Sequence, residues 1–306
     1  MTGAKLAAAY AGIVFGIYWI PIRAMEASGF EGLWSTLVFL AVPAMMLLPV
    51  ALFRFKRILN APIKFYFGTF LVGLAFTLYA TSYLYTEVIR VALLFYLLPV
   101  WGFLLGWAFL GERITAIRWI SMALGILGML VIFDIGVGFP LPRNIGDWMA
   151  LIGGMSWAVG SLVILTERRV HTIEYTLGFF FWAGILTTAF FFIATPPESL
   201  VPPGWDTIAE TAPWILSVMV LIVIPGGFAT IYAPTKLNPG VAGLLFLTEI
   251  SVASISAALW ANEPFGPREI LGVLLISGAA VFEPLTDLFR SRRSLPPNSI
   301  PTSPCD

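Results

Sequence analysis

One acidic residue stands out because it lies inside a long apolar segment. Glu249 is about nine residues into the stretch 240–261, where Leu247, Thr248 and Ile250 surround it. A charge that deep in a membrane costs about 2.5–3.5 kcal/mol on insertion scales, so an ionisable group there is a functional candidate by default. Glu249 could bind a proton or face the ammonium group of an amino acid. As a protonated carboxyl it could instead hydrogen-bond a neighbouring helix, which is a structural role.

Aromatic side chains within the apolar segments could form the walls of a binding site. Tyr79 and Tyr83 are four residues apart and therefore share one face of a helix. Trp19, Trp101 and Trp157 lie away from the ends of their segments, whereas tryptophan normally gathers at the membrane interfaces. Each ring offers a flat apolar surface and a polar group to a ring-bearing ligand. Together with the acid these residues are predicted to bind substrate; the alternative for each is ordinary helix packing or contact with lipid.

Prolines and glycines mark places where a helix could bend or line a cavity. Pro225, Gly226 and Gly227 follow one another inside an expected helix. Proline removes a backbone hydrogen bond and the glycines loosen the next turn. Freed carbonyls at membrane depth are tolerated only inside protein or beside a cavity. We therefore predict hinge or cavity-lining roles for this triplet, and likewise for Pro21 and Pro99.

The sequence gives little support for catalysis and none for a metal or a cofactor. His171 is the only histidine and Cys305 the only cysteine, which excludes two-histidine metal motifs, cysteine-based sites and an internal disulfide. The chain also lacks a Gly-x4-Gly-Lys-Ser/Thr loop for ATP. Asp134 and Asp147 fall at the ends of expected helices, where we predict solvated side chains rather than the paired acids of an intramembrane protease. We predict that the chain is not an enzyme.

Composition places these residues in a membrane protein. Of 306 residues, 59% are hydrophobic and 11% charged, and the mean hydropathy is +0.91. A soluble domain is about 45–50% apolar and about 25% charged, so a soluble or disordered chain is excluded. The run 6–22 after Lys5 is interpreted as a first spanning helix rather than a signal peptide, because it lacks a clear exit site. At about 20 residues per spanning helix, we expect ten, near 6–24, 33–53, 63–84, 89–110, 117–134, 147–165, 174–195, 211–233, 240–261 and 267–286.

The distribution of charge predicts an orientation. The 17 basic residues balance 17 acidic ones, so no nucleic-acid partner is expected. With a cytoplasmic N-terminus and ten spans, the basic residues fall mostly inside and both termini are cytoplasmic. The Pro-rich tail 289–306 is expected to be disordered. No lysine or arginine falls mid-span, which argues against phosphorylated substrates. The basic residues that would lie outside are Arg23, Arg90, Arg143 and Arg268.

The chain also repeats itself. Five helices per half is an odd number, so a second copy enters the membrane from the opposite side, and such inverted repeats place a site between the halves. We therefore predict an all-α integral membrane protein with ten transmembrane helices, built as two inverted five-helix repeats, 1–140 and 141–288, around a central cavity. The matching segments are Ala80–Tyr83 with Ala229–Tyr232, Leu93–Phe95 with Leu244–Phe246, and Glu112 with Glu263.

Two of these segments carry a family pattern. The first runs from Leu98-Pro99-Val100 to Gly111-Glu112 and on to Gly128, and the second from Glu249 through Asn262-Glu263 to Gly278. The pattern resembles the EamA-type signature of the drug/metabolite transporter superfamily, although the usual Glu-Pro is Glu249-Ile250 here. Within it the chain is most similar to the bacterial YddG-type exporters of aromatic amino acids. The resemblance implies a basket-like ten-helix fold with a central cavity, and export of amino acids or related metabolites. We expect a monomer in the bacterial inner membrane.

These observations lead to one expected function and several rivals. We expect a secondary transporter that exports amino acids, aromatic or other neutral ones, and related small metabolites by alternating access. A first rival is an exporter of apolar cationic drugs in which Glu249 is the counter-charge. A membrane-embedded enzyme acting on lipids is a second rival, and a passive channel is a third. Saturable transport would distinguish either exporter, of amino acids or of drugs, from a passive channel.

Overall fold

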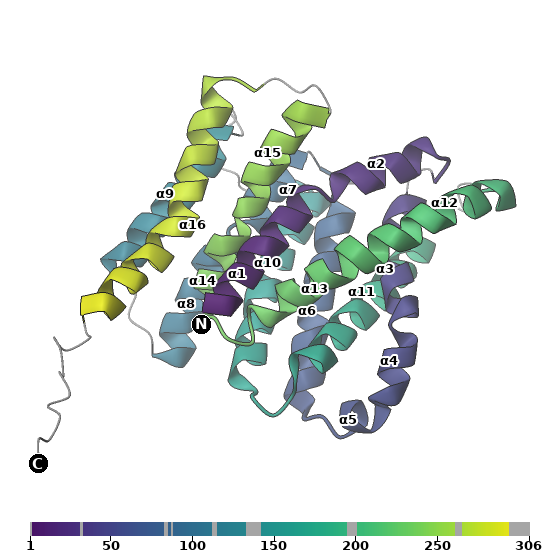
Figure 1. Ribbon diagram of the computed structural model, residues 1–306, viewed down its shortest axis with the longest axis horizontal. Coiled ribbons are helices and arrows are strands. Elements are labelled where there is room, and N and C mark those ends of the chain that lie inside the picture. Colours follow the sequence, from purple (N-terminus) through teal and green to yellow (C-terminus); the bar gives the residue numbers. More distant parts are fainter. Residues whose placement is uncertain are drawn as a thin grey trace, which may run out of the picture.

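The described part of the chain is built from helices alone. The computed structural model describes residues 2–30, 33–82, 85–86, 88–111, 115–132, 142–194, 201–260 and 265–293, and it contains no strand within them (Figure 1). The helices are α1 (Thr2–Gly16), α2 (Trp19–Ala27), α3 (Leu33–Met46), α4 (Leu48–Phe53), α5 (Phe55–Leu59), α6 (Ile63–Ser82), α7 (Val88–Phe95), α8 (Leu98–Leu110), α9 (Ala116–Ile132), α10 (Ile145–Thr166), α11 (Thr172–Ala194), α12 (Trp205–Val218), α13 (Ile224–Tyr232), α14 (Pro239–Phe246), α15 (Thr248–Trp260) and α16 (Pro267–Arg293).

Several of these helices are long and apolar enough to cross a membrane. Within the described ranges, 7 helical stretches meet that length and composition, and α8 and α9 are shorter apolar helices. The chain is therefore a multi-pass membrane protein, while ten crossings remain a prediction. The 7 stretches are Thr2–Ala27, Leu33–Phe53, Ile63–Ser82, Ile145–Thr166, Thr172–Ile193, Trp205–Tyr232 and Pro239–Trp260.

Two predicted boundaries are wrong. The stretch 196–210 was expected to be a loop, but α12 begins at Trp205, directly after Pro202-Pro203-Gly204, and Asp206 in its first turn suits the positive end of the helix. The last helix, α16, continues to Arg293, so the start of the expected tail 289–306 is helical. Residues 294–306 lie outside the described part of the chain.

A proline interrupts the first long helix. Pro21 has no N–H to give to the carbonyl of Ile17, and that carbonyl accepts a hydrogen bond from the N–H of Ile20 instead, at 3.1 Å. The tighter turn separates α1 from α2 at Ile17 and Tyr18.

Two further helices are broken in the same way, one in each half of the chain. The pair α7 and α8 has 8 and 13 residues, and so does the pair α14 and α15. Pro99 begins the second piece in the first pair, whereas the corresponding position in the second pair is Ile250. The N–H of Ile250 nevertheless bonds the carbonyl of Leu247 at 3.0 Å, so this break forms without a proline.

The Pro225 segment contains a different irregularity. A π-helical turn, Met219–Val223, joins α12 to α13, and Pro225 follows it directly. The hydroxyl of Tyr18 donates a hydrogen bond to the carbonyl of Val223 at 3.4 Å. A Cβ at Gly226 would lie 2.7 Å from that hydroxyl, and one at Gly227 would collide with the ring of Phe180. The two glycines therefore let α13 pack closely on α1 and α11.

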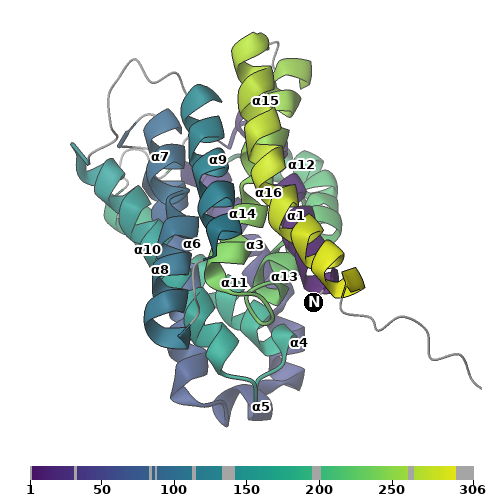
Figure 2. The ribbon, with the colours of Figure 1, turned by 90° about the vertical axis from the view of Figure 1, so that its left-hand side faces the viewer.

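Helices of the first half pack mainly against helices of the second half. Figures 1 and 2 show α9 alongside α16, and α6 lies against both α10 and α11. The helix α1 packs on α13 and α15, α3 on α11, and α8 on α14. The buried core therefore lies between the two halves of the sequence rather than within either one.

A buried ion pair joins α7 to α10 and corrects the prediction for Asp147. That side chain has 0% exposed surface and is not solvated. The guanidinium of Arg90 lies 2.5 Å from its Oδ2, the hydroxyl of Thr86 donates to Oδ1 at 2.7 Å, and the N–H of Arg143 donates to Oδ2 at 2.8 Å. Arg90 was assigned to an outer loop but lies in α7, whose start packs on the start of α10. The other expected helix-end acid, Asp134, lies outside the described residues.

Removing one member of this pair should be costly. Asp147→Leu leaves Arg90, which is 9% exposed, buried without its counter-charge, and we expect a loss of about 3–5 kcal/mol. Adding Arg90→Met should restore much of that loss, which thermal unfolding of the purified protein in detergent would measure. Glu269→Gln is the control, because its partner Arg268 is 47% exposed and an exposed pair contributes about 0–1 kcal/mol. A double variant as unstable as the single one would contradict this account.

Glycine contacts between helices give a second stability prediction. A Cβ at Gly154 of α10 would stand 2.5 Å from the carbonyl oxygen of Phe95, the group that Pro99 cannot bond. We expect Gly154→Ala to destabilise the protein by about 1–3 kcal/mol through overpacking. Gly278→Ala in α16 is the matched control, since nothing lies within 4 Å of its added carbon. Equal melting temperatures for the two variants would show that α7 and α10 are not in close contact.

Candidate functional site

Glu249 is held by two tyrosines from the other half of the chain. It is the second residue of α15, directly after the break at Leu247. The hydroxyl of Tyr79 in α6 donates to its Oε1 at 3.4 Å, and Tyr96, between α7 and α8, is hydrogen-bonded to the same carboxyl group. The carboxyl group is therefore a polar link between the two halves.

The helix break gives the carboxylate a suitable position. Because α15 starts at Thr248, Glu249 lies in the first turn, where the unpaired N–H groups of a helix favour negative charge. Tyr96 is only 3% exposed, whereas Glu249 keeps part of its surface accessible. The acid is thus bonded by the tyrosines and is not completely covered by the described part of the chain.

Aromatic rings surround these tyrosines and form what we call the central aromatic cluster. The ring of Tyr79 lies 4.3 Å from that of Phe95, and Phe76 contacts Trp157 at 6.3 Å and Phe179 at 5.3 Å between ring centres. Trp157 in turn meets Phe246 edge-on at 5.9 Å. The cluster draws on both halves of the chain. Its members are Phe15, Tyr18, Phe76, Tyr79, Phe95, Tyr96, Trp157, Phe179 and Phe246.

The structure brings some of the predicted binding residues together and separates others. Tyr79, Trp157 and Glu249 meet at the central cluster. Trp19 instead links α2 to α15, because its indole N–H donates to Ser256 at 2.9 Å. Its ring also lies 5.3 Å beneath the guanidinium of Arg23.

The other two predicted aromatics are Tyr83 and Trp101. Tyr83 lies outside the described residues. Trp101 lies in α8, and its indole Nε1 is buried without a hydrogen-bond partner in the described part of the chain. Buried polar groups nearly always have a partner. The Trp101 N–H is therefore available to a ligand that carries an acceptor.

The predicted hinge residues lie beside the cluster. Pro21 follows Tyr18 by three residues and Pro99 follows Tyr96 by three, so each helix break is next to a ring of the cluster. Gly226 packs against Tyr18, and Pro225 precedes it at the π-helical turn. The irregular backbone thus surrounds the aromatic and acidic groups, as expected where helices line a site.

Most members of the cluster were not predicted, and four of these are Tyr18, Phe76, Tyr96 and Phe246. A signal existed for two of them. Phe76 is three residues before Tyr79 and shares its helix face. Phe246 belongs to the repeated Leu-Leu-Phe segment. Tyr18 and Tyr96 had no local signal, because they became recognisable only once the helix breaks were placed.

The chemistry of this arrangement suits binding. A carboxylate with two hydroxyl donors can hold an ammonium group or a proton, and the rings offer flat apolar surface. In the described ranges no three side chains of His, Cys, Asp or Glu come together as metal ligands. Broken membrane helices that meet at a carboxylate and apolar rings are typical of helical membrane transporters.

Comparison with known proteins identifies the family within that class. The model of the EamA-like transporter family matches residues 2–134 and 144–282, and the chain belongs to this family. The resemblance seen in the sequence is thereby confirmed at the level of the family. Membership of the YddG-type exporters remains a prediction.

Individual relatives agree with this assignment. An uncharacterized transporter of Bacillus subtilis (strain 168), YvbV, is 28% identical over 188 residues, which are 58% of this chain and 57% of the relative. The chain thus matches little more than half the length of that curated relative. A solved crystal structure aligns with 96% of this chain and 100% of its own, with a TM-score of 0.70 and 17% identity, and shows the same fold. The family and the named relative point to a transporter rather than an enzyme.

Trp101 in the first half and Trp157 in the second half should respond differently to substitution. Trp157 is 4% exposed among other rings, so Trp157→Ala should cost about 3–5 kcal/mol of stability. Trp101→Phe removes only an unpartnered N–H and part of a ring, so we expect little loss of stability. Thermal unfolding without added ligand measures both. A large loss for Trp101→Phe would mean that its N–H already has a structural partner.

Proposed function

We propose that the chain is a secondary transporter that exports aromatic or other neutral amino acids, and related metabolites, across a bacterial inner membrane. The observation that carries the proposal is the carboxyl group of Glu249, hydrogen-bonded by Tyr79 and Tyr96 at the edge of the central aromatic cluster. The carboxylate would hold the ammonium group of the substrate, and the rings would hold its side chain. Trp101 would give its indole N–H to the substrate carboxylate.

The matched helix breaks support an inverted repeat of ten spans, with halves at 1–140 and 141–288. In a pseudo-twofold arrangement, equivalent helices close to the axis touch each other. The pairs α3 with α11 and α9 with α16 fit that expectation, and the broken helix made of α7 and α8 contacts its counterpart, made of α14 and α15, through α8 and α14. The family match in two segments of similar length, 2–134 and 144–282, supports it as well.

Alternating access would use the contacts between the halves. The hydrogen bonds of Glu249 run from α15 in one half to Tyr79 and Tyr96 in the other. A substrate ammonium group can replace the hydroxyl donors, so that binding weakens this link while the substrate is present. The halves could then rock about the site, with the breaks at Pro21, Pro99 and Leu247 as bending points.

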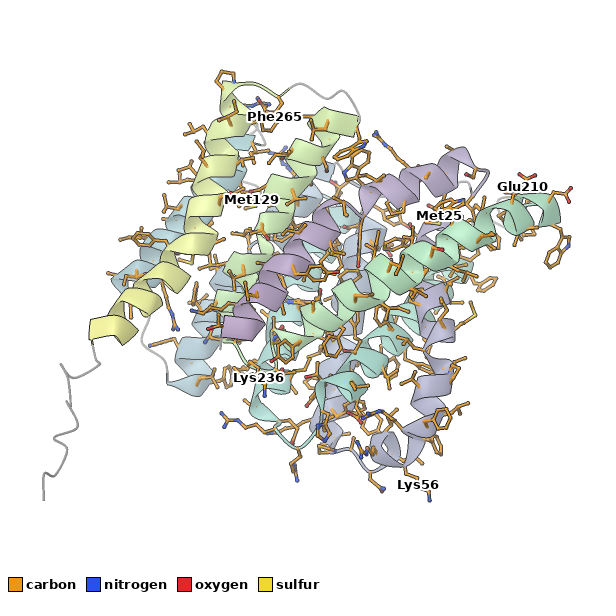
Figure 3. The ribbon with its side chains drawn as sticks, viewed as in Figure 1. Met25, Lys56, Met129, Glu210, Lys236 and Phe265 are labelled. Atoms are coloured by element: carbon orange, nitrogen blue, oxygen red, sulfur yellow. The ribbon has the colours of Figure 1, made fainter. Side chains whose placement is uncertain are left out.

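The distribution of charge supports an orientation with cytoplasmic termini. In Figure 3 the labelled Lys56 and Lys236 lie toward one end of the molecule and Glu210 lies toward the other. Cytoplasmic segments of membrane proteins carry the excess of lysine and arginine. We therefore assign the end with α5 and the link between α10 and α11 to the cytoplasm.

A second candidate function follows from the same acid. Aromatic rings beside a carboxylate also suit an apolar cation, because ring faces attract positive charge. Export of apolar cationic drugs, with Glu249 as the counter-charge, is therefore the alternative to export of amino acids.

Counterflow in liposomes tests both functions. We expect saturable uptake of labelled phenylalanine or tryptophan that unlabelled aromatic amino acids compete away and cationic drugs do not. Glu249→Gln should raise the half-saturating concentration about tenfold or more, because one charge-assisted hydrogen bond is lost. Glu269→Gln, at a surface pair, should leave it unchanged.

Three other results would contradict the proposed function. Competition by cationic drugs alone would replace amino acids with drugs as the substrate class. Flux that does not saturate would indicate a channel. Unchanged kinetics in Trp157→Ala would show that the central aromatic cluster does not bind the substrate, and unchanged kinetics in Trp101→Ala would show that the Trp101 N–H does not.

A further inference from the structure

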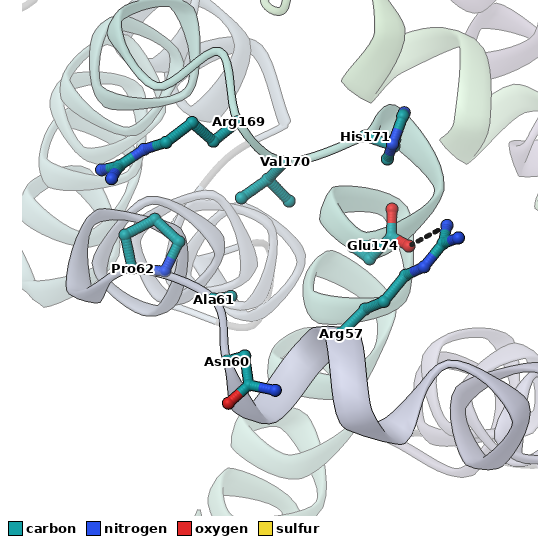
Figure 4. A pocket seen from close by; sticks show the side chains of 8 residues that line it. All are labelled: Arg57, Asn60, Ala61, Pro62, Arg169, Val170, His171 and Glu174. Atoms are coloured by element: carbon teal, nitrogen blue, oxygen red, sulfur yellow. Dashed lines mark ion pairs between the residues drawn. The ribbon is translucent and has the colours of Figure 1, made fainter.

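A separate polar pocket opens at the end of the molecule that we assign to the cytoplasm. Its volume is about 530 Å³, within the range of small-molecule sites. It lies between the turn from α5 to α6 and the link from α10 to α11 (Figure 4). The lining residues are Arg57, Asn60, Ala61, Pro62, Arg169, Val170, His171 and Glu174.

Glu174 has an unsatisfied oxygen in this pocket. The residue is only 2% exposed, and its Oε1 pairs with the guanidinium of Arg54 at 2.6 Å. Its Oε2 is buried and has no hydrogen-bond partner among the described residues. Figure 4 shows one carboxylate oxygen facing Arg57 and the other turned toward His171. A buried acceptor without a donor is costly, which points to a ligand that supplies one.

Arg57 adds an available positive charge beside this acid. Its side chain is 64% exposed, and its Nη1 lies 3.9 Å from Oε1 of Glu174, too far for a hydrogen bond. Arg169 differs, because its guanidinium is hydrogen-bonded to both oxygens of Glu167 and thereby lowers the pKa of Glu167 to about 2. The pocket therefore presents one carboxylate oxygen and one guanidinium with spare bonding capacity.

We propose that this pocket binds the zwitterionic head group of an amino acid before the amino acid moves to the central aromatic cluster. The ammonium group would donate to Oε2 of Glu174, and the carboxylate would accept from Arg57. The apolar side chains of Ala61, Pro62 and Val170 would face the rest of the molecule. A simple anion would leave Oε2 unsatisfied, and a simple cation would leave Arg57 unused. The proposal rests on the proposed function, since it names the entry site of that transporter.

A local label tests occupancy of the pocket without measuring transport. Cys305 is the only cysteine, so Cys305→Ser gives a background in which Ala61→Cys can be labelled by a maleimide in phosphatidylcholine nanodiscs. We expect phenylalanine to slow this labelling saturably. Phe265→Cys, at the opposite end in Figure 3, should label at the same rate with and without phenylalanine. Asn60→Cys, at an exposed lining residue, serves if Ala61→Cys does not fold.

Two variants and three ligands show which charged group of the ligand each side chain binds. Glu174→Gln keeps an acceptor for Arg54 but loses the negative charge, so protection by phenylalanine should need about tenfold more ligand. It should leave protection by 3-phenylpropionate, which has no ammonium group, unchanged. Arg57→Gln should weaken protection by phenylalanine and 3-phenylpropionate and spare phenethylamine, which has no carboxylate. Glu269→Gln is the control for the change in charge.

The outcomes separate the two proposals. Absence of protection by phenylalanine, or protection insensitive to Glu174→Gln, would overturn the pocket assignment even if counterflow succeeds. Protection without counterflow would keep the pocket and reject the transporter proposal. Phosphatidylethanolamine carries the same pair of charges, so protection by nanodiscs of that lipid alone would make a lipid head group the occupant and also overturn the assignment.

Discussion

A carboxyl group among apolar helices has to be hydrogen-bonded where it lies, and the centre of this protein is organised around that requirement. Glu249 obtains its donors from Tyr79 and Tyr96, which belong to helices of the other half. The bonds hold only if α15 begins beside α6 and the junction of α7 and α8. The break at Leu247 brings this about, because it puts Glu249 in the first turn of a helix. The aromatic rings then close around the tyrosines.

Breaking helices in a membrane raises a second requirement, since every freed backbone group must meet protein. Backbone carbonyls at several of the breaks meet protein groups nearby. The carbonyl of Ile17 takes the N–H of Ile20, and the carbonyl of Val223 takes the hydroxyl of Tyr18. The carbonyl of Phe95 packs directly on Gly154. Small residues are therefore needed opposite the breaks, and this explains why helices of the two halves approach so closely there.

Local patterns in the sequence were sufficient for part of this arrangement. Apolar length gave the membrane class, and the prolines gave the breaks beside Pro21 and Pro99. The pairing of Arg90 with Asp147 joins residues 57 apart, and that of Trp19 with Ser256 joins residues 237 apart. No local pattern encodes such partners, so an acid expected in solvent proved buried and a predicted binding tryptophan proved to be a helix contact. The break at Leu247 was missed because no proline marks it.

The placement of charge along the molecule explains why a zwitterion suits the proposed route better than an anion. Glu174 and Arg57 lie together at one end, whereas Glu249 lies beside the central aromatic cluster, whose members are all aromatic. An anion bound by Arg57 would face the carboxylate of Glu249 at the central aromatic cluster. It would also lose the positive charge of Arg57 on leaving the pocket. An amino acid carries its own ammonium group, which can leave Glu174 and pair with Glu249. Its ring gains apolar contact in the same step, so both parts of the molecule favour the inward move.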